Sequence, residues 1–177
     1  MWNSQVIIML LEGIRDTLYM TLASTLFGYI IGLPMGIVLT VTDKDGIRPN
    51  AAVYKVLDVI SNLLRSIPFI ILLIVLIPFT RFVVGRSYGS TATIVPLTIA
   101  AAPFIARMVE SSLKEVDAGV IEAARSMGAS DFQIVTKVML VEARTSLVVG
   151  ATISLGTILG YSAMAGTVGG GGLGDIA

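Results

Sequence analysis

The chain has 177 residues, of which 55% are hydrophobic and 14% charged, and its net charge at pH 7 is zero. Soluble domains carry about 25% charged residues, so this composition excludes a water-soluble fold, and the lack of a basic patch argues against nucleic-acid binding. The sequence contains neither cysteine nor histidine, which excludes disulfides, thiol chemistry, His/Cys metal sites and histidine acid–base catalysis.

Four segments are expected to cross a membrane, because a spanning helix needs about 20 mostly apolar residues. Three charge-free windows reach that length, at 17–41, 87–106 and 145–174. A fourth window, 66–80, is too short alone, but the apolar helical face of 56–64 extends it. The chain is therefore predicted to be an all-α polytopic membrane protein without β-sheet. Its four transmembrane helices are expected near 17–41, 56–80, 87–108 and 143–165.

The N-terminal run VIIMLL (6–11) is too short to span and is expected to lie at the membrane interface. It is not a cleavable signal, because no basic region precedes it and Glu12 follows it. In the first predicted span, Gly28, Gly32 and Gly36 repeat at four-residue spacing. Such a stripe lets two backbones approach closely in lipid, so it favours helix packing.

Prolines occur in three of the predicted spans and can bend or interrupt them. These prolines are Pro34, Pro68, Pro78, Pro96 and Pro103. No carboxylate lies deep in a charge-free window, since Asp58 and Glu110 fall near span ends. A proton-coupled carrier usually needs a buried ionisable relay, so that class is disfavoured. A serine without a histidine has no obvious base, so an enzyme is not expected.

The segment 107–144 is much longer than a turn between spans requires. Asp117 is suited to cap a helix from Ala118 to Met127, and Gly128 is suited to end it. Ser130 and Gln133 then form an S-x-x-Q capping box for a second helix that runs toward the last span.

The first of these helices carries one apolar face. Val120, Ile121, Ala124 and Met127 follow helical spacing, and Glu122 and Arg125 border them. An isolated helix this short is marginal in water, so another surface must hold it. Two interpretations remain open from the residues alone: a helix lying on the membrane face, or a helix docked in the groove of a cytoplasmic protein.

The last predicted span is smooth and mildly polar, which suits either tight packing or a pore lining. Near its end, Tyr161, Ser162 and Met164 are candidates for a gate, because methionine is flexible and small neighbours leave it room. The alternative is that Met164 fills a packing gap. GGGGLG (169–174) formally matches a dinucleotide-binding pattern, but no strand precedes it, so a flexible turn is expected.

Lysine and arginine counts predict the orientation, because basic residues accumulate in cytoplasmic segments. Three lie on the side of the N-terminus, Arg15, Arg81 and Arg86. The opposite side holds nine: Lys44, Arg48, Lys55, Arg65, Arg107, Lys114, Arg125, Lys137 and Arg144. The N-terminus is therefore expected outside the cell, and the C-terminus also after four spans.

EAARSMG (122–128) resembles the EAA motif of permease subunits of bacterial ATP-binding-cassette importers, and the chain is most similar to the methionine subgroup. The resemblance runs from about residue 17 to the end. Further blocks that support it are RSIPFIILL (65–73), IPFTR (77–81), IVPLT (94–98), AAPFIARMVE (101–110), GYSAMAG (160–166) and GGGGLG (169–174).

The resemblance implies a homodimeric permease in the bacterial inner membrane, without a cofactor or metal. An extracytoplasmic binding protein would deliver methionine, and separate cytoplasmic ATPase subunits would hydrolyse ATP. The residues implied to contact the ATPase are Val120, Ile121, Glu122, Ala123, Ala124, Arg125, Met127 and Gly128. Alternatives are a permease for another amino acid or a small peptide and, with less support, a secondary carrier.

Two departures from the family pattern stand out. The motif usually closes with Ile-x-Leu-Pro, where this sequence has Val138, Met139, Leu140 and Val141. Family members of this type also have a fifth transmembrane helix after the glycine turn. Residues 1–177 are therefore expected to form a single transmembrane domain that is incomplete at its C-terminus.

Overall fold

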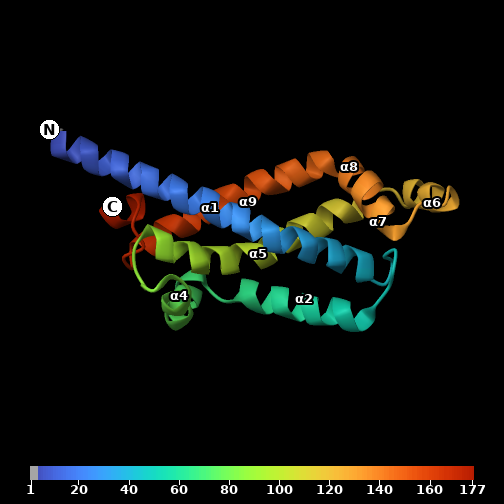
Figure 1. Ribbon diagram of the computed structural model, residues 1–177, viewed down its shortest axis with the longest axis horizontal. Coiled ribbons are helices and arrows are strands. Elements are labelled where there is room, and N and C mark those ends of the chain that lie inside the picture. Colours follow the sequence, from blue (N-terminus) through green and yellow to red (C-terminus); the bar gives the residue numbers. More distant parts are fainter. Residues whose placement is uncertain (1–3) are drawn as a thin grey trace.

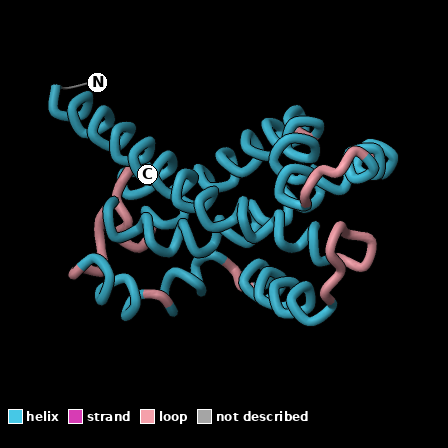
Figure 2. Tube along the Cα trace, turned by 45° about the vertical axis from the view of Figure 1, so that its right-hand side comes forward, coloured by secondary structure: helices cyan, strands magenta, loops and turns pink. Residues whose placement is uncertain are grey.

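The computed structural model describes residues 4–177, and all regular structure among them is helical (Figures 1 and 2). Three helices are long and apolar enough to cross a membrane, and a fourth span exists if the bent pair α2 and α3 counts as one. The prediction of an all-α polytopic membrane protein is confirmed. The long helices are α1 (Ser4–Thr42), α2 (Ala51–Ser66), α5 (Ser90–Lys114) and α9 (Arg144–Gly166).

Shorter elements connect the long ones at both ends of the molecule. At the end where α6 lies (the α6 end), the chain also turns from α1 into α2, and at the opposite end (the glycine-loop end) residues 169–172 follow α9 (Figure 1). These shorter elements are α3 (Phe69–Val75), α4 (Ile77–Val84), α6 (Ala118–Ser126), α7 (Asp131–Gln133), the π-helix η1 (Ile134–Met139), α8 (Leu140–Glu142) and α10 (Leu173–Ile176).

Helix α1 begins at Ser4 and continues without a break to Thr42. The run 6–11 is thus continuous with the first span rather than a separate segment. Its side chains are mostly exposed, with Leu11 at 59%. Leucine, methionine and glutamate favour helix, and no proline lies before residue 34, so nothing in this stretch ends the helix.

The prediction of one continuous helix over 56–80 is wrong. Helix α2 ends at Ser66, Ile67 is extended (φ −81°, ψ 124°), and α3 leaves at 103° to α2. Pro68 explains the break, because its ring disfavours helical geometry in the preceding residue and it has no N–H to donate. A charge-free window measures length and apolarity, and neither property reports this bend.

Helices α1 and α5 form the centre of the core, where the glycine stripe of α1 faces α5. A Cβ on Gly32 would lie 2.7 Å from the Ala102 oxygen and 2.8 Å from Ile105 Cβ. A Cβ on Gly28 would lie 3.1 Å from Ala101 Cβ. The stripe is therefore a packing surface, as predicted.

The helix signals between α5 and α9 are confirmed. The Asp117 side chain accepts from the Gly119 N–H at 2.8 Å, and Gly128 has the left-handed φ of 84°. Ser130 and Gln133 form both bonds of the capping box. The second helix does not run on as a regular α-helix, because it passes through the π-helix η1 and α8 before α9 begins.

The turn predicted at 169–174 is present, and hydrogen bonds hold it against α1 and α5. The Gly89 N–H donates to the Gly169 oxygen at 2.9 Å, and Thr93 Oγ1 donates to the Gly170 oxygen at 3.2 Å. The Leu173 N–H donates to Thr17 Oγ1 at 2.9 Å. These bonds fasten the loop after α9 to the start of α5 and to Thr17, which lies within α1.

Candidate functional site

Helix α6 lies at one extremity of the molecule (Figure 1) and divides its apolar residues between two surroundings. Ala124 is 5% exposed and belongs to the hydrophobic core, and Ile121 packs against that core. Met127, by contrast, is 82% exposed and Val120 is 41% exposed. Two residues of the face that was predicted as a single docking surface thus pack against the chain's own core, and the other two are exposed to solvent.

The remaining residues of the EAA segment are open to solvent, with Glu122, Ala123 and Gly128 all exposed. Arg125 reaches back to the body of the protein. Its Nη2 donates to the Ile47 oxygen at 3.0 Å and lies 3.8 Å from Asp131 Oδ1. This guanidinium therefore joins α6 to the loop between α1 and α2 and to the start of α7.

A cleft of about 580 Å³ opens between α6, the loop after α1 and the end of α5. Its lining is mixed, with acidic, basic and apolar side chains. Asp43, Lys114, Ile121, Glu122 and Arg125 are among the residues that line it. The cleft therefore separates part of α6 from α1 and α5, while the opposite side of α6 is exposed to solvent.

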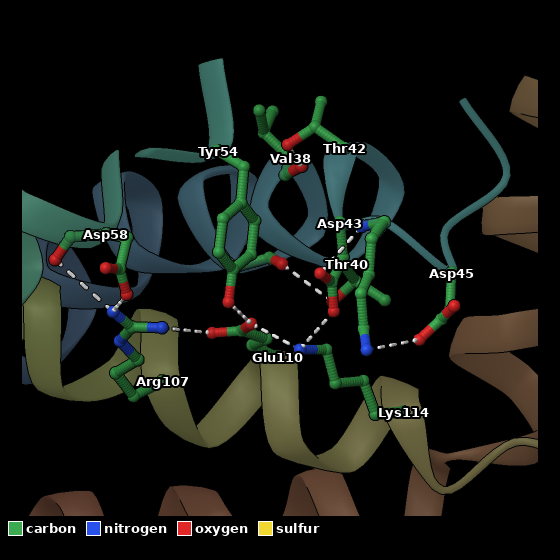
Figure 3. A network of polar contacts seen from close by, with 12 residues as sticks. Val38, Thr40, Thr42, Asp43, Asp45, Tyr54, Asp58, Arg107, Glu110 and Lys114 are labelled. Atoms are coloured by element: carbon green, nitrogen blue, oxygen red, sulfur yellow. Dashed lines mark hydrogen bonds and ion pairs between the residues drawn. The ribbon is translucent and has the colours of Figure 1, made fainter. Parts of the chain in front are cut away.

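Charged side chains from three helices converge beside this cleft (Figure 3). Arg107 of α5 pairs with Asp58 of α2, and its Nη1 lies 2.7 Å from Glu110 Oε2. Lys114 Nζ lies 2.7 Å from Glu110 Oε1 and 2.6 Å from Asp43 Oδ2. Alternating signs therefore run from α2 through α5 to the end of α1.

This ion-pair chain (Asp43, Lys114, Glu110, Arg107 and Asp58) is most buried at its central carboxylate, Glu110, and most exposed at Lys114. The side chain of Glu110 is 6% exposed and that of Lys114 is 41% exposed. The Tyr54 hydroxyl also donates to Glu110 Oε1 at 3.1 Å. A buried carboxylate needs such compensation, because an unpaired charge is strongly disfavoured in a low dielectric.

This chain of ion pairs was not predicted from the sequence. Asp58 and Glu110 were placed near span ends but were not paired. Asp58 lies 49 residues from Arg107, whereas Arg107 and Lys114 have helical spacing to Glu110 on α5 itself. The available signal was charge balance, because carboxylates at the more basic ends of apolar helices call for partners at the same depth. Outside the spans, hydrogen bonding to Lys114 lowers the pKa of Asp43 below its ordinary value of 3.8.

The three candidate gate residues of α9 lie in different surroundings. The Tyr161 ring stacks on Phe69 of α3, with centroids 4.7 Å apart and planes 3° from parallel. Ser162 is 1% exposed and donates to the Leu159 oxygen at 2.8 Å. Met164 is 47% exposed. The structure thus brings Tyr161 to the break between α2 and α3, buries Ser162 and leaves Met164 open.

Residues 4–177 contain no cluster of three or more acidic, histidine or cysteine side chains that could hold a metal ion. The features that the described residues do present are a protruding helix, α6, and charged contacts between helices. These features suit the transmission of movement between elements.

Relatives of known type are similar to this chain in sequence. The chain is 56% identical over 158 residues to the "D-methionine transport system permease protein MetI" of Salmonella typhimurium, covering 89% of this chain and 73% of that protein. A probable D-methionine transport system permease protein of Vibrio cholerae is 48% identical over 169 residues, or 96% and 75% of the two chains.

Solved structures agree. A structure described as an inward-facing conformation of the MetNI methionine ABC transporter matches with a TM-score of 0.97 and 54% identity, over 99% of this chain and 81% of that chain. An amino acid ABC transporter matches with a TM-score of 0.77 at 21% identity, over 97% and 77% of the two chains, and supports the fold alone.

The family described as "Binding-protein-dependent transport system inner membrane component" has a sequence profile that matches residues 9–177. The match includes all the candidate residues of α6 and α9. It confirms the predicted resemblance of the chain to importer permeases. The chain therefore belongs to this family of inner membrane transport components.

Proposed function

We propose that this protein is the permease subunit of an ATP-driven methionine importer. The observation that carries the proposal is the 56% identity to a D-methionine permease over 89% of the chain. The near-superposition on a methionine transporter structure, with a TM-score of 0.97, supports it. On this proposal the chain provides the path through the bilayer and carries out no bond chemistry itself.

The proposed assembly contains two copies of this chain, two cytoplasmic ATPase subunits and an extracytoplasmic substrate-binding protein. One copy leaves much apolar surface uncovered, including Leu26 (60%) on α1 and Val148 (66%) on α9. Lipid and the second copy would cover these faces, since apolar side chains are stable against either. ATP hydrolysis belongs to the partner subunits.

The α6 end is proposed to face the cytoplasm, which leaves the N-terminus outside. Of the twelve lysines and arginines, nine were assigned from the sequence to the side that carries α6. The structure corrects one of them, because Arg65 lies in the last turn of α2, away from the α6 end, which leaves eight. Basic residues near span ends are retained on the cytoplasmic side during insertion. This orientation also puts the open side of α6 where a cytoplasmic ATPase can reach it.

Helix α6 is proposed to couple ATPase movement to the membrane helices. Met127 and Val120 offer apolar contacts to a partner groove, and Glu122 and Ala123 border them. Ile121 and Ala124 fix the helix to its own core, and Arg125 ties it to the Ile47 oxygen. Displacement of α6 by the ATPase would therefore pull on the loop that joins α1 to α2.

Tyr161 and Met164 are proposed to lie along the substrate path near the glycine-loop end, with Ser162 packing behind them. Met164 is exposed in one copy and can close against the same residue of a second copy. Its unbranched thioether adapts to such a contact and to an apolar substrate. Met164→Ala should loosen this closure and raise basal ATP hydrolysis.

The proposed function is tested by co-purification with the ATPase, followed by methionine-stimulated ATP hydrolysis in liposomes with the binding protein. Met127→Glu places a charge on the open side of α6 without disturbing its core contacts, so it should abolish assembly or stimulation. Met127→Leu keeps the apolar contact and should behave like the unmodified protein. Normal stimulation in the glutamate variant would remove α6 from the coupling contact.

A further inference from the structure

Arg65 is the charged residue whose position the proposed function leaves unexplained. It lies in the last turn of α2, two residues before the extended Ile67, where the chain bends by 103°. It is 14 residues beyond the first residue of α2, or about 21 Å along the helix axis. An arginine this far along a transmembrane segment is costly and marks a functional site unless an anion compensates it.

Arg107 of α5 is an arginine whose charge is compensated within the protein. Arg107 pairs with Asp58 and Glu110 and also donates to Asn62 Oδ1 at 3.2 Å. Asp58 is seven residues before Arg65, about 10 Å along α2, and is already engaged by Arg107. Within residues 4–177, the exposed side chain of Arg65 makes no hydrogen bond or ion pair with another residue.

Arg65 lines a pocket of about 200 Å³ that also has aromatic walls. Phe69 of α3, Phe104 of α5 and Tyr161 of α9 line it with Leu72. The rings of Phe69 and Tyr161 stack on one another in this wall, with planes 3° from parallel. The helix break thus brings a guanidinium without an anion and an aromatic surface into one cavity with room for a small molecule.

We propose that this pocket holds the free amino acid as it crosses the membrane. The substrate carboxylate pairs with the Arg65 guanidinium, whose planar fork matches a carboxylate with two hydrogen bonds. The thioether side chain lies against the rings, because sulfur makes favourable contacts with aromatic edges. This assignment rests on the proposed function and adds to it a residue that recognises the carboxylate.

Two simpler roles for Arg65 make different predictions. A basic residue in the last turn compensates the free carbonyls of the helix, and a lysine would do this equally well. A lipid phosphate could also occupy the guanidinium, and that contact would depend on the content of anionic lipid. Neither role requires the aromatic wall or a substrate carboxylate.

The test uses the permease–ATPase complex and photo-methionine, which keeps the carboxylate and carries a photoreactive diazirine. Cross-links should map to the pocket residues of α3, α5 and α9, and excess methionine should suppress them, whereas methionine amide should not. In proteoliposomes with the binding protein, Arg65→Gln should raise the KM for methionine uptake by about tenfold to a hundredfold. Its kcat should change much less, and Arg65→Lys should fall between the two.

Arg81→Gln is the matched control, since Arg81 also lies in the last turn of its helix, α4, and does not line the pocket. It should transport like the unmodified protein. If the unmodified complex takes up methionine but the cross-links map elsewhere, the proposed pocket is wrong and the proposed function stands. The same holds if the KM of Arg65→Gln is unchanged. An effect of Arg65→Gln confined to vesicles with anionic lipid would overturn the pocket in favour of a headgroup site.

If the unmodified complex fails to transport methionine, the proposed function fails instead. The same variants are then measured with the amino acid that it does transport. A raised KM in Arg65→Gln would still support the carboxylate site, and an unchanged KM would overturn it.

Discussion

Helix α5 is held to α1 and to α2 in opposite ways. Against α1 it packs where side chains are missing, with glycines at 28, 32 and 36 facing Ala101, Ile105 and Val109. Against α2 it is held by polar side chains, through an ion pair of Arg107 with Asp58 and a hydrogen bond from Tyr54 to Glu110. The contact of α5 with α1 depends on close approach of the two backbones. The contact with α2 is made by long side chains, so the distance between these two helices can vary.

The difference indicates which parts of the molecule can move. The contact between the glycine stripe of α1 and α5, called the glycine seam below, leaves little room for the two helices to slide, because any shift brings their backbones into collision. Ion pairs between flexible side chains can instead re-form with new partners. Helix α2 also ends at the break before Pro68, so α2 to α4 can change their position while α1 and α5 stay together. We expect transport movements to use the charged contact and to preserve the glycine seam.

Arg107→Ala should have the largest effect on stability. It leaves Glu110, whose side chain is 6% exposed, with less compensation, and frees Asp58 from its partner. Removing one partner of a buried ion pair costs about 3 kcal/mol or more. Equilibrium unfolding in mixed micelles should show this loss. The matched control Arg48→Ala, at an exposed loop arginine, should stay within about 0.5 kcal/mol of the unmodified protein.

Gly32→Ala tests the other contact. Its Cβ would come within 2.7 Å of the Ala102 oxygen, which is backbone and cannot turn aside. Overpacking of this kind costs about 1–3 kcal/mol. Gly156→Ala on α9 is the control, since nothing lies within 4 Å of its added Cβ. Equal stability of the two alanine variants would contradict a tight seam between α1 and α5.

Local signals predicted α6 well, and contacts between distant residues could not be predicted. Asp117, Gly128 and the Ser130–Gln133 pair act within a few residues, so the sequence alone indicates where helices begin and end. The bend after α2 depends on how Pro68 is accommodated by neighbouring helices, since Pro34, Pro96 and Pro103 stay inside continuous helices. Two of the ion pairs, Arg107–Glu110 and Glu110–Lys114, lie within one helix at the spacings i,i+3 and i,i+4, which the sequence alone shows. The pairs of Asp58 with Arg107 and of Asp43 with Lys114 join residues far apart in the sequence, and no local pattern records such a pairing.

Ser130→Ala should have a smaller and local effect. It removes the side-chain acceptor for the Gln133 N–H and so breaks the capping box before η1. Loss of a helix N-cap costs about 1 kcal/mol. Hydrogen exchange should accelerate in residues 131–139 and stay unchanged along α1 and α5. Uniform acceleration across the chain would show instead that this cap supports the whole fold.

The smallest expected effect is the acid sensitivity of Asp43. Its folded-state pKa is lowered by Lys114, so its stabilising contribution is fully present above the ordinary value of 3.8. That contribution is lost as the pH falls through the lower folded pKa. Asp43→Asn should therefore reduce stability near neutral pH and flatten the decline in acid. Parallel pH profiles for the two proteins would exclude the Asp43–Lys114 pair as a contributor.

The most direct test of the account is uptake of radiolabelled methionine into liposomes that contain this chain, its ATPase and the binding protein. The account predicts accumulation inside the vesicles above the outside concentration, only with ATP on the side of α6. Accumulation or equilibration in vesicles that contain this chain without the ATPase would contradict it and indicate a secondary carrier.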